Sequence, residues 1–314
     1  MANPDDPRLG SIIHEGDLGD VVIVGFPFAE GVRRNGGRAG SALGPQYFRQ
    51  FLGAMGALVN REYDVDLSSL SIGDAGDVEG ATLEEAHQNL RAKVRKLIQN
   101  GAIPFVVGGG NDQSYPNAAA MLDEWPDRSV AAINIDAHLD VRPKLGGLAH
   151  SGSPFRDLLE DPRFDGHCFT EFGAQGGQCS AVHADYVRDH GGRIRWFSEI
   201  ESSPEQAFSE ELVRAASTEK KLFVSFDLDA IQGADCPGVS CPATIGISAS
   251  SAMKIAFAAG LAENIKLFDL SELNPIIEAY RTPRLAVNLF YFFLIGAATR
   301  VKKRDEMRGI VEAK

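Results

Sequence analysis

The sequence has few cysteines and no excess of positive charge. Four cysteines in a chain of 314 residues are too few for a disulfide scaffold and indicate a reducing compartment. Acidic residues outnumber basic ones by 43 to 31, and the resulting net charge of −12 argues against nucleic acid as a partner. A small anionic substrate stays compatible, because only the charges that face its pocket act on it. We therefore expect a cytoplasmic protein that binds no nucleic acid.

The sequence also lacks a basic leader and a long apolar run. Its first twenty residues, "MANPDDPRLGSIIHEGDLGD", are polar and acidic, so we expect a flexible N-terminal segment over 1–20 and not a targeting signal. The longest apolar run, "LAVNLFYFFLIGAA" (285–298), is short for a bilayer span and contains Asn288. A buried core helix is the better interpretation, and we expect no membrane partner.

No linker, repeat or low-complexity segment interrupts an alternation of apolar strands and amphipathic helices. The pattern predicts strands at 21–27, 103–109, 131–135, 167–174, 193–198, 221–230 and 264–271, and helices at 82–101, from about 114, 179–190, 203–217, 248–261 and 284–300. Such alternation is typical of a parallel sheet with helices on both faces. We predict one doubly wound α/β domain over residues 1–314, with its ligands at the carboxyl ends of the strands.

Polar motifs follow four of these strands, at the point where each strand ends. They are "GGGND" (108–112), "DAHLD" (136–140), "SFDLD" (225–229) and "SELNP" (271–275). In a parallel sheet these ends lie along one edge, so groups that are far apart in sequence can meet there.

Two of the motifs supply acids that need neutralising. Asp136, His138 and Asp140 lie on one side of an extended backbone, and Asp227 and Asp229 end another strand. Four close carboxylates repel each other unless cations intervene, and oxygen ligands with one imidazole suit Mn²⁺ better than structural Zn²⁺. Bridging carboxylates could hold two ions about 3.5–4 Å apart, which would ionise a shared water to a hydroxide nucleophile. The alternative is a pair of capped strand ends without a metal.

The four motifs resemble, in order and spacing, the signatures of the arginase/agmatinase/formiminoglutamase (ureohydrolase) family. The resemblance extends through "SFDLDAIQGADCPGVS" and covers the chain from about Val21 to Val301. It implies a three-layer, arginase-like α/β domain around a mostly parallel eight-stranded sheet. It also implies a binuclear manganese centre, hydrolysis of a C–N bond in a guanidinium or amidine, and assembly into a homo-oligomer, either a trimer or a hexamer.

The resemblance assigns roles to the motif residues. It gives one metal site residue 111, Asp136, Asp140 and Asp227, and the other site Asp136, His138, Asp227 and Asp229. Glu272 matches the acid that holds the cationic C–N group of the substrate, and Asp229 is placed to pass a proton to the departing nitrogen.

Asn111 departs from the family, which usually has histidine at this position. An amide offers only a neutral oxygen, or a nitrogen that cannot coordinate a metal. We therefore expect two Mn²⁺ ions with a weakened first site. The alternative is a metal-poor pseudoenzyme with a binding role, and Asn111 could also simply cap the helix that follows it.

Arginines on the strand-end loops indicate a substrate with carboxylates. The segment "GVRRNGGRAG" contributes Arg33, Asn35 and Arg38, while Arg142 follows the metal motif and Arg156 stands in "HSGSPFR". Arginine suits bidentate carboxylate binding. "DAHLDVRP", "HSGSPFR" and "CPGVSCPA" look most like formiminoglutamases among the family's members.

The predicted reaction is therefore Mn²⁺-dependent hydrolysis of N-formimidoyl-L-glutamate to formamide and L-glutamate, a step of histidine degradation. An agmatinase, a guanidinobutyrase or an arginase is the alternative within the family. A proton shuttle often follows the DAHxD segment, and either His150 or Ser151 could occupy that position here, although a serine cannot do the same acid–base work.

Overall fold

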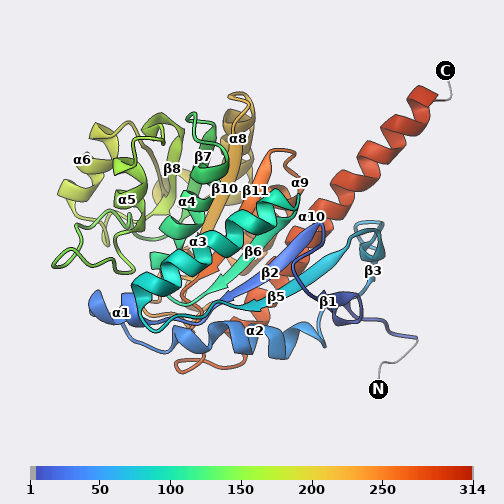
Figure 1. The fold of residues 1–314 in the computed structure, drawn as a ribbon, viewed down its shortest axis with the longest axis horizontal. Coiled ribbons are helices and arrows are strands. Elements are labelled where there is room, and N and C mark those ends of the chain that lie inside the picture. The colour runs from blue at the N-terminus through green and yellow to red at the C-terminus, as the bar shows by residue number, and fades with distance from the viewer. Residues whose placement is uncertain (1–4, 313–314) are drawn as a thin grey trace.

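A nine-stranded sheet, parallel throughout, runs through the centre of the molecule (Figure 1). The computed structural model describes residues 5–312, with side chains as far as residue 307. The strand order is β1-β5-β2-β6-β11-β10-β7-β8-β9. The strands are β1 (Ile13–Glu15), β2 (Val21–Phe26), β5 (Ile72–Asp77), β6 (Ile103–Gly108), β7 (Val130–Ile135), β8 (Phe169–Ala174), β9 (Arg193–Trp196), β10 (Lys221–Asp227) and β11 (Ile265–Ser271). A separate antiparallel pair joins β3 (Val59–Asn60) to β4 (Val65–Asp66).

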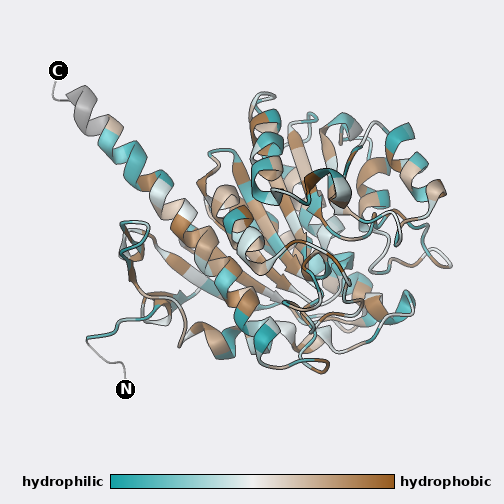
Figure 2. Cartoon of the chain, turned by 180° about the vertical axis from the view of Figure 1, so that it is seen from behind, coloured by the Kyte–Doolittle hydropathy of each residue, from teal (hydrophilic) through white to brown (hydrophobic). Residues whose placement is uncertain are grey.

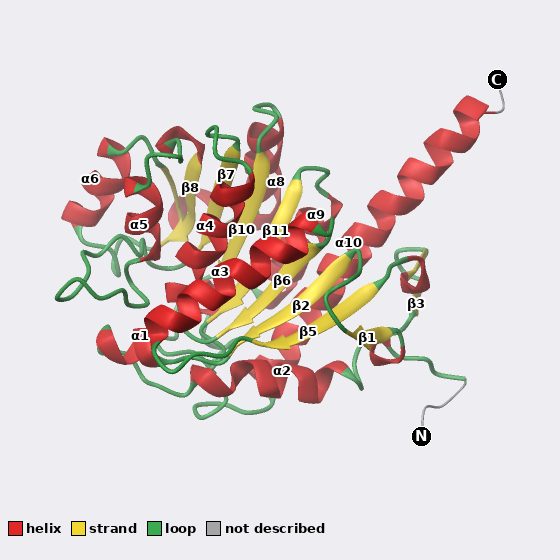
Figure 3. Cartoon of the chain, viewed as in Figure 1, coloured by secondary structure: helices red, strands yellow, loops and turns green. Residues whose placement is uncertain are grey.

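Helices cover both faces of this sheet, which gives three layers (Figure 3). The layer toward the viewer in Figure 1 contains α3 (Leu83–Gln99), α4 (Ser114–Glu124) and α5 (Pro154–Glu160). The opposite layer contains α2 (Gly44–Leu52), α8 (Pro204–Ala216), α9 (Ala249–Leu261) and α10 (Arg281–Glu312). The remaining helices are α1 (Glu30–Arg34), α6 (Ala181–Asp189) and α7 (Phe197–Ile200). The predicted doubly wound α/β architecture is confirmed.

The helices begin where the sequence signals say they should. Thr82 caps α3, because its hydroxyl accepts a hydrogen bond from the Glu85 backbone N–H at 3.2 Å. The Glu85 carboxylate in turn accepts from the N–H of Ala81, so it satisfies one more free donor at the helix start. A buried stripe at helical spacing then faces the sheet: Leu83, Ala86, Leu90, Val94 and Leu97.

Two strands at one end of the sheet, β1 at the edge and β5 next to it, were not predicted from the sequence. Strand β5, "IGDAGD", carries two acids and lacks an apolar run, and β1 has only three residues. Their addition brings the sheet to nine strands, one more than the eight expected. The segment 1–20, expected to be flexible, is attached to the sheet in its described part, because Leu9 is fully buried and β1 pairs with β5. Residues 1–4 lie outside the described residues.

The apolar run near the C-terminus forms part of α10, which is longer than the predicted helix 284–300. By length and composition the span 281–307 could cross a membrane, but 67% of its apolar window is buried inside the protein. Phe290 and Phe293 pack on Phe105 of β6, with ring centroids 4.6 and 5.4 Å apart. Figure 2 shows the hydrophobic first half of α10 against the body and its hydrophilic second half projecting away. The run is therefore a core helix.

The four strands that carry polar motifs are neighbours in the sheet. They are consecutive in the order β6-β11-β10-β7 and occupy its centre. The registers are parallel, so the carboxyl ends of all four strands open on the same edge. The fold thus gathers the motifs without any long loop having to reach across the molecule.

Candidate metal centre

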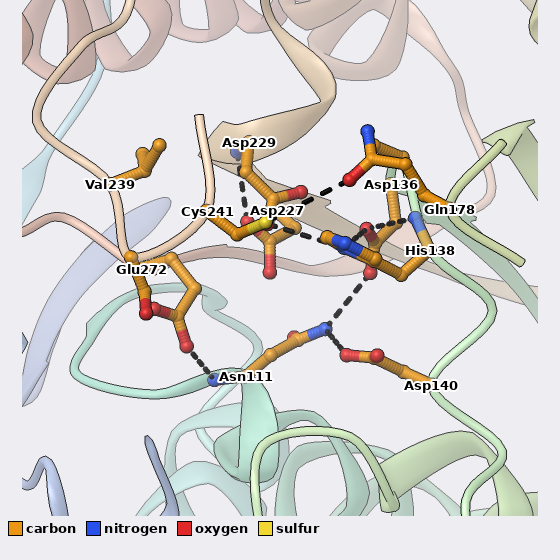
Figure 4. A network of polar contacts seen from close by, with 12 residues as sticks. Asn111, Asp136, His138, Asp140, Gln178, Asp227, Asp229, Val239, Cys241 and Glu272 are labelled. Carbon is orange, nitrogen blue, oxygen red and sulfur yellow. Dashed lines mark hydrogen bonds and ion pairs between the residues drawn. The ribbon is translucent and has the colours of Figure 1, made fainter. Parts of the chain in front are cut away.

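The acids of the motifs meet above the ends of these four central strands (Figure 4). Asp136 follows β7, Asp227 is the last residue of β10, and Asp229 lies in the 3₁₀ turn that follows. Glu272 follows β11, and Asn111 begins the 3₁₀ turn after β6. The backbone turns at the end of each of these strands, and the turns direct the side chains into one shared space.

Two groups of three side chains have the arrangement of a metal site. One group is Asp136, His138 and Asp229, and the other is Asp136, Asp140 and Asp227. Within each group, one possible ligand atom per residue lies within 4.8 Å of the other two. Asp136 belongs to both groups, as expected of a bridging ligand. The second bridge expected from the sequence, Asp227, belongs to one group only.

The carboxyl groups in this space have shifted pKa values. Burial, together with neighbouring carboxylates, raises the pKa of Asp140 and of Asp227 well above the usual range. Burial also raises the pKa of Asp229 to about 6, against the opposing charge of His138. The pKa of Asp136 is lowered, because its hydrogen bonds to His138 outweigh the effect of its burial. The cluster therefore stores electrostatic repulsion that a cation would relieve.

His138 lies between the two acids of its group. Its Nδ1 is 3.2 Å from Asp136 Oδ1 and 3.3 Å from Asp229 Oδ2. The charge of Asp229 raises the pKa of His138 strongly. A divalent cation would take the place of that proton, because metal ligation requires the neutral imidazole. Among the described residues, Asp229 Oδ1 is buried and has no hydrogen-bond partner. This free oxygen, with the other carboxylates and one imidazole, fits a hard or borderline divalent ion.

Asn111 faces this cluster with its amide nitrogen. Nδ2 donates to Asp140 Oδ2 at 2.9 Å and to Asp136 Oδ2 at 3.4 Å. The oxygen Oδ1 points away from the carboxylates, toward two serine hydroxyls. In this orientation Asn111 is a hydrogen-bond donor to the metal ligands and presents no lone pair to a metal ion.

Two residues of the cluster have a left-handed backbone. Asp140 has φ 44° and Glu272 has φ 64°, and a glutamate in this region is uncommon. The Glu272 N–H donates to the Gly109 carbonyl at 2.8 Å, which fixes the turn against the end of β6. A Cβ at Gly109 would lie 1.8 Å from the Phe28 carbonyl oxygen, so only glycine permits this close approach. The backbone is thus strained where it aims the carboxylates.

A cavity of about 260 Å³ opens over the cluster. His138, Asp140, Asp227, Asp229 and Glu272 form one wall. The rest of the lining, the loop wall, comes from three loops and consists of Asn35, Gly36, Gly37, Arg38, Arg142, Ser151, Ser240 and Cys241. Within the loop wall, Arg142 Nη1 donates to Asn35 Oδ1 at 2.9 Å, and Asn35 Nδ2 donates to Ser151 Oγ at 3.0 Å. The cavity is therefore lined both by buried acids and by exposed cationic groups.

Comparison with known proteins identifies this arrangement. A family model described as "Arginase family" matches residues 19–296. The chain belongs to the arginase family. It is 33% identical to a formimidoylglutamase of Klebsiella pneumoniae over 262 residues, which cover 83% of this chain and 80% of the relative.

Solved structures of the arginase family match more closely. The formiminoglutamase of Trypanosoma cruzi with Mn²⁺ is 51% identical with a TM-score of 0.89, and the match covers 94% of this chain and 100% of the other. A variant of that enzyme in which one asparagine is replaced by histidine, also with Mn²⁺, is 50% identical with a TM-score of 0.90, over 94% and 99% of the two chains.

Three residues predicted for this arginase-family site do not line the cavity. Arg33 pairs with Glu30 at 2.8 Å and is 64% exposed. Arg156 lies over the Tyr186 ring at 4.1 Å and donates to Glu160 at 3.0 Å. These placements correct the expectation that both arginines face the substrate: each is held by an acid on its own helix.

The third is His150, which is buried with both ring nitrogens in use. Nε2 lies 3.0 Å from the Pro143 carbonyl oxygen, and Nδ1 accepts from the Gly152 N–H at 3.2 Å. Its neighbour Ser151 lines the cavity instead. The loop therefore places the serine, and not the histidine, at the cavity.

Several polar residues behind the arginase-family cluster were not identified from the sequence. Asn134 donates to Asp136 Oδ2 at 3.4 Å and to the fully buried Glu171 at 2.9 Å. Ser114 and Ser271 contact Asn111 from the side away from the cavity. A polar residue inside a predicted buried strand was the available signal for Asn134 and Glu171. No signal distinguished the two serines from ordinary ones.

Proposed function

We infer that the chain is a manganese-dependent hydrolase that cleaves N-formimidoyl-L-glutamate to formamide and L-glutamate. The observation that carries this proposal is one cavity lined both by the acids of the metal wall and by Arg38 and Arg142 of the loop wall. A substrate with a cationic formimidoyl end and two carboxylates matches both walls at once. The relatives from K. pneumoniae and T. cruzi, named for this activity, support the same assignment.

The metal wall would hold two ions through its carboxylates and His138. When bound, manganese supplies a strong nucleophile from water at neutral pH and stabilises the negative charge that develops during the reaction. The chain's own part is to bring the amidine carbon to this position and to manage its protons. Water adds to that carbon, the bond to the glutamate nitrogen breaks, and the products are formamide and the free amine.

Glu272 would bind the cationic C–N group. It is 4% exposed and lines the cavity, and its Oε2 has no hydrogen-bond partner among the described residues. Its Oε1 accepts from the Asn111 backbone N–H at 3.3 Å, which fixes the carboxyl plane. A free carboxylate oxygen in a buried position is suited to a charge-assisted hydrogen bond from an amidinium N–H.

Asp229 would transfer the proton to the departing nitrogen. Its Oδ2 faces His138, whereas Oδ1 is buried and has no hydrogen-bond partner in the part of the chain that the structure describes. A carboxylate with one free oxygen can accept a proton and pass it on. The glutamate nitrogen needs one proton to leave as an amine, and the Asp229 carboxyl lies in the metal wall, where the amidine would bind.

The loop wall would bind the carboxylates of the glutamate part. Arg142 uses one guanidinium N–H on Asn35 and is exposed to the cavity with the others. Arg38 is fixed by bonds to the carbonyls of Ser240 at 2.8 Å and Val239 at 3.0 Å. Arginines held in this way lose little conformational freedom on binding, so they suit bidentate recognition of a carboxylate.

We also propose that Asn111 weakens the first metal position, since it turns its nitrogen toward Asp136 and Asp140. The chain would then need ample Mn²⁺ to fill both positions. The T. cruzi formiminoglutamase and a variant of it in which histidine replaces an asparagine both have structures with Mn²⁺, so that enzyme binds manganese with either residue.

A panel of substrates tests the proposal. Purified protein with excess Mn²⁺ is expected to hydrolyse formimidoylglutamate at least a hundredfold faster than arginine, agmatine or guanidinobutyrate, judged by kcat/KM. Faster turnover of one of the other three would move the chain to another branch of the family. Failure to bind Mn²⁺ and to hydrolyse any of the four would favour the binding protein that Asn111 suggested.

Three further properties complete the proposal. The activity places the chain in histidine degradation, where formimidoylglutamate must be supplied by opening of an imidazole-derived ring. Its four cysteines are free, which supports a reducing, cytoplasmic setting. We propose a homo-oligomer, a trimer or a hexamer, and light scattering of the purified protein tests this.

A further inference from the structure

A group of buried hydroxyls and one acid lies behind Asn111, on the side away from the cavity. Ser114 Oγ donates to Asn111 Oδ1 at 2.7 Å, and Ser271 Oγ donates to the same oxygen at 3.1 Å. Asp269 Oδ2 is 3.2 Å from Ser114 Oγ. All four residues are fully buried. Of this group, Asn111 is the member whose side chain donates to Asp140 and Asp136 of the cluster.

The two hydroxyls decide which way the amide faces. An amide has a donor end and an acceptor end, and each must find a complementary partner when buried. With Oδ1 toward two hydroxyl donors, Nδ2 must face Asp136 and Asp140, which is the observed orientation. Residue 111 can present an oxygen to a metal ion only if the amide turns over, and the turn costs both hydroxyl bonds to Oδ1.

For one of the two serine hydroxyls, the group also contains a second hydrogen-bond acceptor. Ser114 has a single hydroxyl hydrogen but three neighbours that can accept it: Asn111 Oδ1 at 2.7 Å, Ser225 Oγ at 3.0 Å and Asp269 Oδ2 at 3.2 Å. If the amide turned, Nδ2 would donate to Ser114 Oγ, and the Ser114 hydrogen would rotate to Asp269. Ser271 has no such second acceptor among the contacts of the described residues, so it opposes the turn more strongly.

We propose that Ser114, Ser271 and Asp269 are positioning residues that set the orientation of the Asn111 amide and thereby the Mn²⁺ affinity of the first metal position. Ser271 holds the amide in its donor orientation, and the Ser114–Asp269 pair allows it to turn. The proposal deepens the manganese site of the proposed function and rests on it. It explains how a chain with asparagine at this position keeps its amide away from the metal.

The test measures Mn²⁺ affinity, not turnover. Binding isotherms from the electron paramagnetic resonance of free Mn²⁺ give the dissociation constant of the weaker position. Ser271→Ala removes one bond that opposes the turn, so that constant is expected to fall about fivefold, the usual worth of one neutral hydrogen bond. Ser41→Ala is the matched control, because Ser41 is equally buried and its hydroxyl has no hydrogen-bond partner among the described residues.

A second background makes the test specific to orientation. In Asn111→Asp the side chain has two equivalent oxygens, so one can accept from the serines while the other faces a metal ion. The serine then no longer opposes ligation, and Ser271→Ala in this background is expected to give no gain in Mn²⁺ affinity. A double-mutant cycle over the four proteins gives the coupling directly.

The outcomes separate the two proposals. An equal gain from Ser271→Ala in both backgrounds, no gain in either, or the same gain from Ser41→Ala would overturn the orienting role, whatever the substrate. A gain in Mn²⁺ affinity from Ser271→Ala with Asn111 but not with Asn111→Asp, without hydrolysis of formimidoylglutamate, would support the orienting role and refute the proposed function. If no variant binds Mn²⁺, both fail. Unfolding curves for each variant confirm that the compared proteins are folded.

Discussion

The two walls of the cavity are built in different ways. The metal wall consists of the cavity-lining residues His138, Asp140, Asp227, Asp229 and Glu272 together with the fully buried Asp136, which both groups of possible ligands share. It comes from the ends of neighbouring strands and the turns that follow them. The loop wall, formed by Asn35, Arg38, Arg142 and Ser151, comes from segments between elements. In the metal wall most side chains are buried, whereas both arginines of the loop wall are exposed.

We expect the two walls to have different roles, with the reaction at the metal wall and substrate recognition at the loop wall. Parallel strands lie about 4.8 Å apart, so the sheet itself sets the spacing of groups at adjacent strand ends. The loop wall is held by side-chain bonds, such as the chain from Arg142 through Asn35 to Ser151. We expect changes in the metal wall to abolish the reaction and changes in the loop wall to alter mainly which substrate is bound.

The largest effect is expected from removing a carboxylate shared within the metal wall. Asp136→Ala takes a member from both groups of possible ligands, and Asp227→Ala takes one of the two expected bridges. We expect kcat to fall at least about 10³-fold in each, because several kcal/mol of transition-state stabilisation come from the metal centre. Rates and bound Mn²⁺ per chain check this. Retained activity in Asp136→Ala would show that the metal wall is not the reacting site.

The next largest effect is expected at Glu272. Glu272→Gln keeps the shape of the side chain and removes the charge opposite the amidinium, so kcat/KM should fall about 10²-fold. Mn²⁺ stoichiometry should stay unchanged, since Glu272 belongs to neither group of three. Loss of Mn²⁺ together with activity would instead assign Glu272 to the metals.

The metal wall could be predicted from the sequence because its acids directly follow apolar strands. That pattern located Asp136, Asp227 and Glu272, and the sheet then brought their strands together as neighbours. The orientation of Asn111 could not be predicted, because it depends on Ser271, which is 160 residues away in sequence. A contact of that kind is visible only once the strands are packed.

The loop wall was predicted less well, and for two physical reasons. Arg33 and Arg156 have acids three residues before and four residues after them, and on a helix these neighbours capture the guanidinium. This spacing is visible in the sequence, and it argues against a substrate-binding role for either arginine. The sequence could not decide between His150 and Ser151 for a different reason. Neighbouring residues in a turn point their side chains in different directions, so an uncertainty of one residue in position changes which side chain reaches the cavity.

The pH dependence of stability gives a third test of the metal wall. The pKa of Asp229 in the folded protein, about 6, lies above the 3.8 that is ordinary for an aspartate. A raised carboxyl pKa stabilises the fold below the unfolded pKa, and that stability is lost as pH rises from about 4 to 6. Metal-free protein should therefore lose up to about 3 kcal/mol at this group, and Mn²⁺ should restore more stability at pH 7.5 than at pH 5. Thermal unfolding with and without Mn²⁺ at both pH values measures the difference.

A smaller effect is expected in the loop wall. Arg142→Ala removes an exposed carboxylate-binding group, so KM for formimidoylglutamate should rise about tenfold with kcat changed less than twofold, a loss of about 1.4 kcal/mol in binding. Arg156→Ala is the matched control, because Arg156 lies on helix α5, a few residues after Ser151, and does not line the cavity. Equal effects of the two substitutions would mean that Arg142 acts through the loop and not through the substrate.

The smallest effect is expected from Asn111→His, which tests whether residue 111 affects metal binding without affecting the choice of substrate. An imidazole nitrogen is a better Mn²⁺ donor than an amide that presents its N–H groups. The substitution also removes the amide oxygen that Ser114 and Ser271 hold away from the carboxylates. We expect a few-fold gain in bound Mn²⁺ at limiting metal, and the ratio of kcat/KM values across the four substrates should stay the same, because Asn111 is not among the residues of the loop wall. Bound Mn²⁺ and the substrate profile are measured before and after the change. Unchanged occupancy would place residue 111 outside the ligands, and a switched substrate would mean that the two walls are not separate in function.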